Sequence, residues 1–170
     1  MAFWNSIVNP KRKNRFKVDV GNLDPLTAKT AVKPVFSVNA HEHNYLNHKF
    51  YFPGMPTWEP VEMTFVDLGS GDATNHSAAV LWDYITTSLG YAMPTDASAL
   101  DLSLNKSGGM GIGDITVTQI DVDGATQDKW TLHNAWIERV AWGDVSYEDD
   151  GFVELSITVR YDYAGFSETS

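Results

Sequence analysis

The sequence contains no cysteine, which excludes both a disulfide framework and a metal site built from thiolates. It also lacks an apolar run approaching the roughly 20 residues that a membrane-spanning helix needs. The first residues place their apolar side chains before a basic cluster, the reverse of the order in a secretory signal, so we expect neither export nor membrane insertion. What remains is an ordinary globular composition over 170 residues, for which one domain is the expectation.

Basic residues are scarce after residue 17. Five of the 12 Lys and Arg residues lie within residues 1–17, which contain no acid, and all 22 Asp and Glu residues follow. The body of the chain is therefore strongly acidic and should repel nucleic acid, whose binding depends on basic side chains. The basic segment Lys11–Lys17 is more typical of a solvated tail, or of a contact to an acidic neighbour, than of a phosphate-binding arm.

The clearest secondary-structure signal lies near the C-terminus, where apolar and polar residues alternate from Val153 to Tyr163. A period of two sends these two sets to opposite faces of a sheet, so we predict a long strand with one dry and one polar face. Trp130–Trp142 is rich in strand-forming residues and precedes it across the acidic connection 143–151. The last quarter of the chain is therefore predicted to be a large hairpin.

The rest of the chain predicts mostly strands and one substantial helix. Residues 75–89 carry apolar side chains at helical spacing, with Thr74 or Asn75 as a possible cap and Gly90 at the end. A short helix is expected over 2–9. Strands are predicted at Phe16–Val20, Val35–Val38, Phe50–Phe52, Thr57–Leu68 and Ile115–Val122.

Two stretches predict irregular structure. The polar segment 39–49 has no clear period and is expected to be a functional loop, and the connection 91–113 includes the glycine-rich segment 105–113. The predicted fold is mainly β, an antiparallel β-sandwich or barrel with one flanking α-helix, because strands do not alternate with helices. We expect a single domain over 1–170, with 1–13 as an N-terminal extension. The expected core includes Trp82, Trp136, Leu155, Ile157, Val159 and Tyr161.

No pattern of catalytic residues stands out. His41 and His43 would face the same way in an extended segment, as the metal-binding histidines of cupins do, but the carboxylate expected after them is missing. The glycines at 108–113 lack the Lys-Ser/Thr ending of a P-loop and precede a strand, and there is no G-x-S-x-G motif. We therefore expect no enzyme activity and no cofactor. A monomeric β-barrel binding protein, or a cupin-like enzyme using His41 and His43, remains the alternative.

Several segments together resemble the tail tube proteins of contractile-tailed, T-even-like bacteriophages. The most distinctive is Leu132–Val140 with its Ala-Trp pair, followed by an acidic turn and Phe152–Tyr163. Asn14–Val18 is similar to the family's first strand, and Phe52–Gly54 followed by Trp58–Phe65 to its central strand. The helix around Trp82 lies in the corresponding place, so the resemblance covers most of the chain in the family's order.

This resemblance implies a ring-forming structural protein, whose homohexameric rings stack into a hollow tube through which the phage genome passes. It implies sheath, baseplate and tape-measure proteins as partners, DNA that passes without specific binding, and a place in the virion tail after assembly in the host cytoplasm. A baseplate protein that initiates the tube, or the tube of a related injection system, fits the same pattern.

On this interpretation, two groups of residues acquire roles. An acidic inner surface would let DNA slide without sticking, and Arg160, a base on the same strand face, would need an acidic partner. Residues expected to face the lumen are Glu62, Thr64, Glu154, Ser156 and Thr158. Residues expected to contact the next ring are His41, His43, Asn44, Tyr45, Asn47 and His48.

Overall fold

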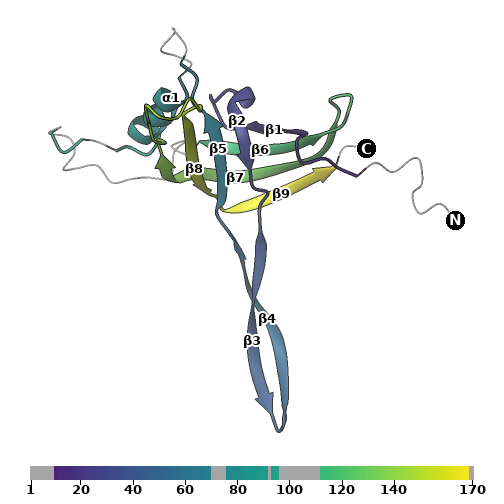
Figure 1. Cartoon of the computed structure of the whole chain (residues 1–170). Helices are drawn as coiled ribbons and strands as arrows, with labels where there is room; N and C mark the ends of the chain where they lie inside the picture. Colours follow the sequence, from purple (N-terminus) through teal and green to yellow (C-terminus); the bar gives the residue numbers. More distant parts are fainter. Residues whose placement is uncertain (1–9, 70–75, 92, 96–111, 169–170) are drawn as a thin grey trace.

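The body of the molecule is one seven-stranded antiparallel sheet with two parts, called the two sheets here, and a separate long hairpin projects from it (Figure 1). The structure is a computed structural model that describes residues 10–69, 76–91, 93–95 and 112–168. Within those ranges no helix is long and apolar enough to cross a membrane. The elements are β1 (Phe16–Asp19), η1 (Pro25–Thr27), β2 (Ala28–Ala31), β3 (Phe36–Tyr45), β4 (His48–Trp58), β5 (Val61–Val66), α1 (Ser77–Asp83), η2 (Tyr84–Ser88), β6 (Gly113–Ile120), β7 (Thr126–Ala141), β8 (Glu154–Arg160) and β9 (Tyr163–Glu168).

The strand order in the body is β1-β6-β7-β8-β5-β2, with β9 also paired to β7. Every pairing is antiparallel. The first part of β7 lies between β6 and β9, and its last part pairs with β8. This long strand therefore belongs to both sheets, and the predicted β7–β8 hairpin is confirmed.

A single bend allows β7 to serve both sheets. Asn134 has φ of 55°, in the left-handed region that asparagine tolerates better than most residues. Its side-chain amide donates to Asp162 Oδ2 at 3.0 Å, and the Asp162 amide donates to the His133 carbonyl at 3.1 Å. The bend also shifts the strand's alternation, because Leu132 is buried, and the next buried residues are Ala135 and Ile137.

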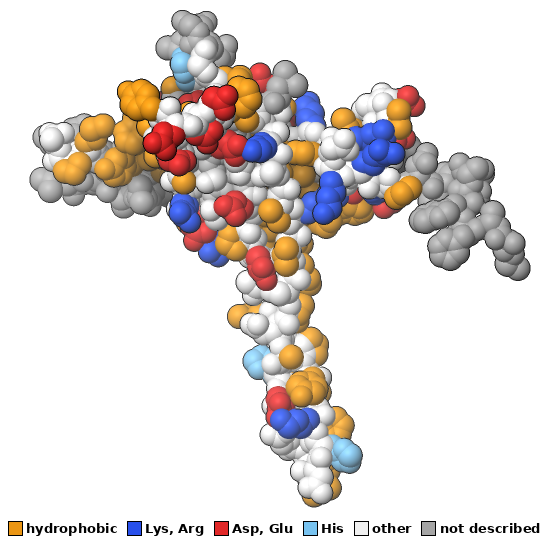
Figure 2. All heavy atoms as spheres, viewed as in Figure 1, with side chains coloured by type: hydrophobic (Ala, Val, Ile, Leu, Met, Phe, Trp, Pro, Cys, Tyr) orange, Lys and Arg blue, Asp and Glu red, His pale blue; other side chains and the backbone are white. Residues whose placement is uncertain are grey.

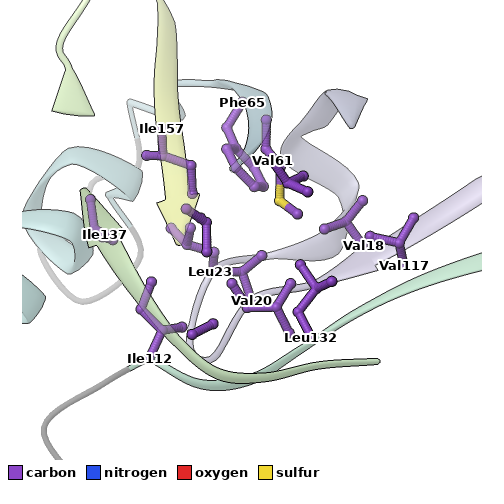
Figure 3. Close-up of a cluster of buried hydrophobic side chains, with 14 of the residues drawn as sticks. Val18, Val20, Leu23, Val61, Phe65, Ile112, Val117, Leu132, Ile137 and Ile157 are labelled. Atoms are coloured by element: carbon purple, nitrogen blue, oxygen red, sulfur yellow. The ribbon is translucent and has the colours of Figure 1, made fainter. Parts of the chain in front are cut away.

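The core fills the space between the two sheets (Figure 3). The predicted dry faces of the strands at 61–66 and 154–160 are both buried in it, and Leu81 of α1 closes one side. Tyr161 ends the second of these faces, and burial raises the pKa of its hydroxyl, with the charge of Glu59 adding to the effect. Leu155, Ile157, Val159 and Tyr161 are thus buried as expected.

Two of the expected core residues lie elsewhere. Trp136 is only half-buried, on the outward face opposite Arg160, because the bend at Asn134 reverses the alternation that would have placed it inside. Trp82 is 41% exposed, because Ser77 and Leu81 are the residues of α1 that face the core, and Trp82 follows Leu81 about 100° further around the helix axis. The ring of Trp82 packs against Trp142 instead.

The predicted strand 153–163 is wrong at its C-terminal end. The strand stops at Arg160, and a separate strand, β9, begins at Tyr163 and pairs with the other part of β7. The predicted helix 75–89 is confirmed as a helical segment over 77–88, α-helical to Asp83 and π-helical from Tyr84, and Gly90 has the positive φ (75°) expected after its end. The predicted helix 2–9, the caps Thr74 and Asn75 and residues 105–111 of the glycine-rich segment lie outside the described residues, while Gly113 begins β6.

Candidate functional site

The predicted loop 39–49 is wrong, because this segment is the far half of the β3–β4 hairpin, called the arm here (residues 36–58). Its two strands pair only with each other, and the arm extends away from the body (Figure 1). Each strand has about ten residues, which at about 3.3 Å per residue gives a projection of roughly 30 Å. No residue of the arm is buried.

The arm exposes large apolar side chains on both faces. The six residues expected to contact another ring all lie on it and are all exposed: His41, His43, Asn44, Tyr45, Asn47 and His48. His41 pairs across the hairpin with Phe52, and His43 with Phe50, so histidines and phenylalanines share one face. The other exposed apolar residues of the arm are Phe36, Val38, Leu46, Tyr51 and Met55.

The tip of the arm is a two-residue turn, Leu46-Asn47, between Tyr45 and His48. Leu46 has φ of 51°, a backbone conformation that favours glycine or asparagine, and its side chain is 85% exposed. Backbone strain together with an exposed apolar side chain favours a contact role for Leu46.

The root of the arm is held by the core. The ring of Phe36 packs on Trp58 at 4.9 Å between centroids, and Trp58 packs on Tyr161 at 6.1 Å. A second anchor is the buried carboxylate of Asp128, which is 3.3 Å from Lys33 Nζ, just before the arm, and 3.2 Å from Lys11 Nζ. One carboxylate therefore ties both the N-terminal segment and the start of the arm to β7.

The five residues expected to face a lumen occupy one continuous surface, called the polar face here. Glu62 lies opposite Thr158, Thr64 opposite Ser156, and Val66 opposite Glu154. Directly opposed residues of an antiparallel pair share a face, and this face is the one turned away from the core.

The charge on the polar face is balanced, so the expectation of an acidic surface is wrong. Glu154 forms an ion pair with Lys29. The expected partner of Arg160 is Glu138, whose carboxylate lies 2.8 Å from the Arg160 guanidinium and whose pKa this hydrogen bond lowers. With Arg139 opposite Thr158, the three bases match the three acids Glu62, Glu138 and Glu154.

The histidines do not form a metal centre in the described residues. No group of three or more His, Asp or Glu side chains there could hold an ion. Glu42, between His41 and His43, pairs with Lys49 at 2.9 Å. The distant His133 pairs with Asp114 at 2.9 Å and stacks on Tyr163. A cupin-like site built on His41 and His43 therefore has no third ligand in this part of the chain.

Sequence reasoning missed the apolar residues of the arm as functional candidates. The signal that could have found them is Phe50-Tyr51-Phe52, three consecutive aromatic residues that cannot all face one side of a strand. It also missed the strand β2, whose Lys29 reaches the polar face.

No protein-family model and no curated protein matches the sequence. The fold, however, is similar to that of a chain in the cryo-EM structure of the anti-feeding prophage cap (AFP tube terminating cap), with a TM-score of 0.70 and 14% identity over 99% of this chain and 100% of that chain. It is also similar to a chain in the sheath-tube complex of PVC, an extracellular contractile injection system in the extended state, with a TM-score of 0.69 and 16% identity over 96% of this chain and 95% of that chain.

A third similar chain comes from the PVC sheath/tube terminator, with a TM-score of 0.68 and 16% identity over 95% of this chain and 99% of that chain. At these identities the likeness concerns the fold. The chain therefore has a tail-tube-like fold of contractile tail systems, which confirms the fold expected from the sequence resemblance.

Proposed function

We propose that this chain is a non-enzymatic structural subunit that forms homohexameric rings in the tube, or in the tube-terminating cap, of a contractile tail or injection apparatus. The observation that carries the proposal is the fold likeness, which extends over 95–99% of the chain to subunits of a cap, a sheath-tube complex and a terminator. The arm and the polar face supply independent support, because both surfaces are explained by contacts in an assembly and not by the stability of a monomer.

The arm is the proposed contact to the next ring. A two-stranded hairpin is marginally stable by itself in water, and this one has two open edges and apolar side chains on both faces. A partner that covers it would bury apolar surface and pair or shield its edges. Stacking on the adjacent ring provides such a partner, with His41, His43, Asn44, Tyr45, Asn47 and His48 joined by Leu46 and Phe50.

The polar face is the proposed lining of the channel. Its charges are largely paired within the subunit, through Lys29–Glu154 and Glu138–Arg160. Paired charges leave little net charge for a passing polymer to bind, and the polar Thr64, Ser156 and Thr158 present no apolar surface for it to adhere to. Free passage would then result from paired charges and polar side chains, and not from repulsion by an acidic lumen.

The proposal includes sheath, baseplate and tape-measure components as partners. In a phage the tube would carry the genome and would belong to the virion tail. In an injection system it would carry another cargo, and a cap or tube-initiating subunit would occupy one end of the same tube. The balanced polar face suits each of these conduits.

Negative-stain electron microscopy and light scattering on the purified chain test the assembly. Rings or stacked tubes are the expected result. If the chain stays monomeric at high concentration and also fails to extend a preformed baseplate or tube, the proposed function is wrong.

The arm is tested with Tyr45→Asp combined with Leu46→Asp. Charge at the tip should abolish stacking while single rings persist, because no body residue is changed. The matched control is Met93→Asp, an exposed apolar residue of the body, which should leave tubes intact. Tubes of normal length from the arm variant would exclude the arm as the stacking contact.

The lumen is tested with introduced thiols, since the natural chain has none. Thr158→Cys in assembled tubes should react with a small maleimide but not with one carried on a large protein, while Thr95→Cys, at an exposed turn, reports whether the large reagent reaches other surfaces. Equal reaction of Thr158→Cys with both reagents would place the polar face outside the channel.

A further inference from the structure

The acidic residues that are missing from the polar face gather at one end of the body. Asp144, Glu148, Asp149 and Asp150 lie in the exposed connection between β7 and β8, called the acidic segment here (residues 142–153). Figure 2 shows these red side chains together at the end of the body that carries α1. Within the described residues none of these four acids forms an ion pair.

The acidic segment also exposes large apolar side chains. Val145 is 87% exposed, Phe152 is 83% exposed, and Tyr147 is fully exposed. A hollow of about 330 Å³ lies beside them, lined by Asp144, Asp149 and Glu154 among others. Exposed apolar residues interleaved with unpaired charge mark a protein contact rather than a solvated loop.

The shape of the acidic segment is set locally. The Glu148 amide donates to Ser146 Oγ at 3.2 Å, and the Gly151 amide donates to Asp149 Oδ1 at 3.0 Å. Two such side-chain turns hold the segment without help from the core, so its side chains are presented in a defined arrangement before any partner arrives.

A complementary surface lies toward the side of the body where the N-terminus leaves (Figures 1 and 2). A hollow of about 390 Å³ there is lined by Lys11, Arg12 and Arg15 together with the apolar side chains of Ile120 and Val122. It also contains Asp121, which lies 3.8 Å from Arg15.

The backbone of this basic surface is fixed while several of its charges stay free. Gln119 Nε2 donates to the Arg12 carbonyl at 3.0 Å, and Lys11 is held by Asp128. In the described part of the chain, Arg12, Lys13 and Lys17 make no ion pair. One end of the body therefore carries unpaired acids and the other side unpaired bases.

A ring of identical subunits uses a heterologous contact, in which one surface binds a different surface of the next copy. Subunits with a net charge of −10 repel one another unless opposite charges meet at that contact. The two surfaces carry opposite charge, acidic around the first hollow and mainly basic around the second. The best match for each surface is therefore the opposite surface on a second copy of the chain.

We infer that the acidic segment of one subunit docks on Lys11–Lys17 of its neighbour in the same ring, and that Tyr147 enters the basic hollow between Arg12 and Arg15. An aromatic ring there would contact both guanidinium groups and the apolar wall. This inference rests on the proposed ring and assigns the two surfaces that close it.

The test is a charge exchange. Arg12→Glu with Lys13→Glu changes the basic surface without touching the ion pairs of Lys11 and Arg15, and Glu148→Lys with Asp150→Lys changes the acidic segment without touching its two turns. Each pair of substitutions alone should raise the protein concentration needed for ring formation at least tenfold, as measured by analytical ultracentrifugation with negative-stain microscopy.

Rescue is the decisive measurement. A chain carrying all four substitutions should form rings again, and so should an equimolar mixture of the two variants, because alternating copies restore every contact. Tyr147→Ala should weaken assembly and Tyr147→Phe should not. Circular dichroism melting confirms that each variant is folded.

The outcomes separate this inference from the proposed function. If the wild-type chain forms rings and the charge variants assemble equally well, or if the four substitutions together do not restore rings, the inference is wrong and the ring remains. If the wild-type chain forms no ring even on a baseplate or tube, both are wrong.

Discussion

The body and the arm both consist of antiparallel strands rich in aromatic and β-branched residues, yet they differ sharply in how many of their side chains are buried. In β5 and β8 every second side chain is buried between the sheets, whereas the arm buries none. The body is stabilised by its own core. The arm makes ladder hydrogen bonds but gains little from burial, so its full stability depends on what covers it.

The largest expected effect comes from charge in the core. Leu155→Asp or Ile157→Asp would bury an unpaired carboxylate at a fully buried position and cost several kcal/mol, enough to unfold the subunit. Thr158→Asp, on the outward side of the same strand and opposite Arg139, is the matched control and should change the free energy of unfolding little. Urea denaturation measures both, and a core variant with wild-type melting would contradict the assigned dry face.

A smaller effect is expected where the body holds the arm and the N-terminal segment. Asp128→Asn removes the charge that pairs with Lys11 and Lys33 while keeping the shape of the side chain, and we expect a loss of about 2 kcal/mol. Limited proteolysis should then cut faster after Lys11. The control is Asp121→Asn, whose partner Arg15 is more distant at 3.8 Å and which should cost about 0.5 kcal/mol or less. Equal losses of unfolding free energy in the two variants would show that Asp128 contributes no more than Asp121.

The arm itself should respond to relief of strain at its tip. Leu46→Gly accommodates the positive φ and should stabilise the hairpin by about 0.5–1 kcal/mol in free subunits. Slower hydrogen exchange of the arm amides would report this. In assembled tubes the same substitution should weaken stacking, because the exposed leucine side chain is lost. An arm that stabilises and also stacks normally would show that the leucine has no contact role.

The smallest effect concerns the paired charges of the polar face. The hydrogen bond from Arg160 lowers the pKa of Glu138, so the stability contributed by this pair is present above the ordinary glutamate pKa and is lost as the pH falls through the lowered value. Arg160→Gln should raise the pKa of Glu138 toward its ordinary value. Carboxyl NMR titration measures the change, and an unchanged Glu138 titration would mean that the pair does not form in solution.

Strands with one buried face were predictable from the sequence, whereas the two strands of the arm were predicted only in part, at Val35–Val38 and Phe50–Phe52. At Val61–Val66 the alternation of apolar and polar residues mirrors alternate burial, so the pattern alone located the strand and its dry face. In the arm both faces meet solvent within the subunit, which leaves no alternation to detect, and the turn Leu46-Asn47 lacks the glycine of a typical two-residue hairpin.

The residues of the polar face were likewise predictable only in part. The sequence placed Glu62, Thr64, Glu154, Ser156 and Thr158 on polar faces of two strands, and the strand register then brought them onto one surface. It could not show that Lys29 and Glu138 neutralise that surface, because both reach it from other strands. The acidic surface expected from the net charge of the chain is therefore not found on the polar face.

The sequence by itself determined the class of fold, the dry faces of the two central strands and the separation of basic and acidic segments along the chain, since each of these depends on residues close together in sequence. Only the tertiary structure decided where β7 bends, where β8 gives way to β9 and that 39–49 is part of a projecting hairpin. The physical reason is that strand pairing joins residues far apart in the chain, and a local period carries no information about the partner.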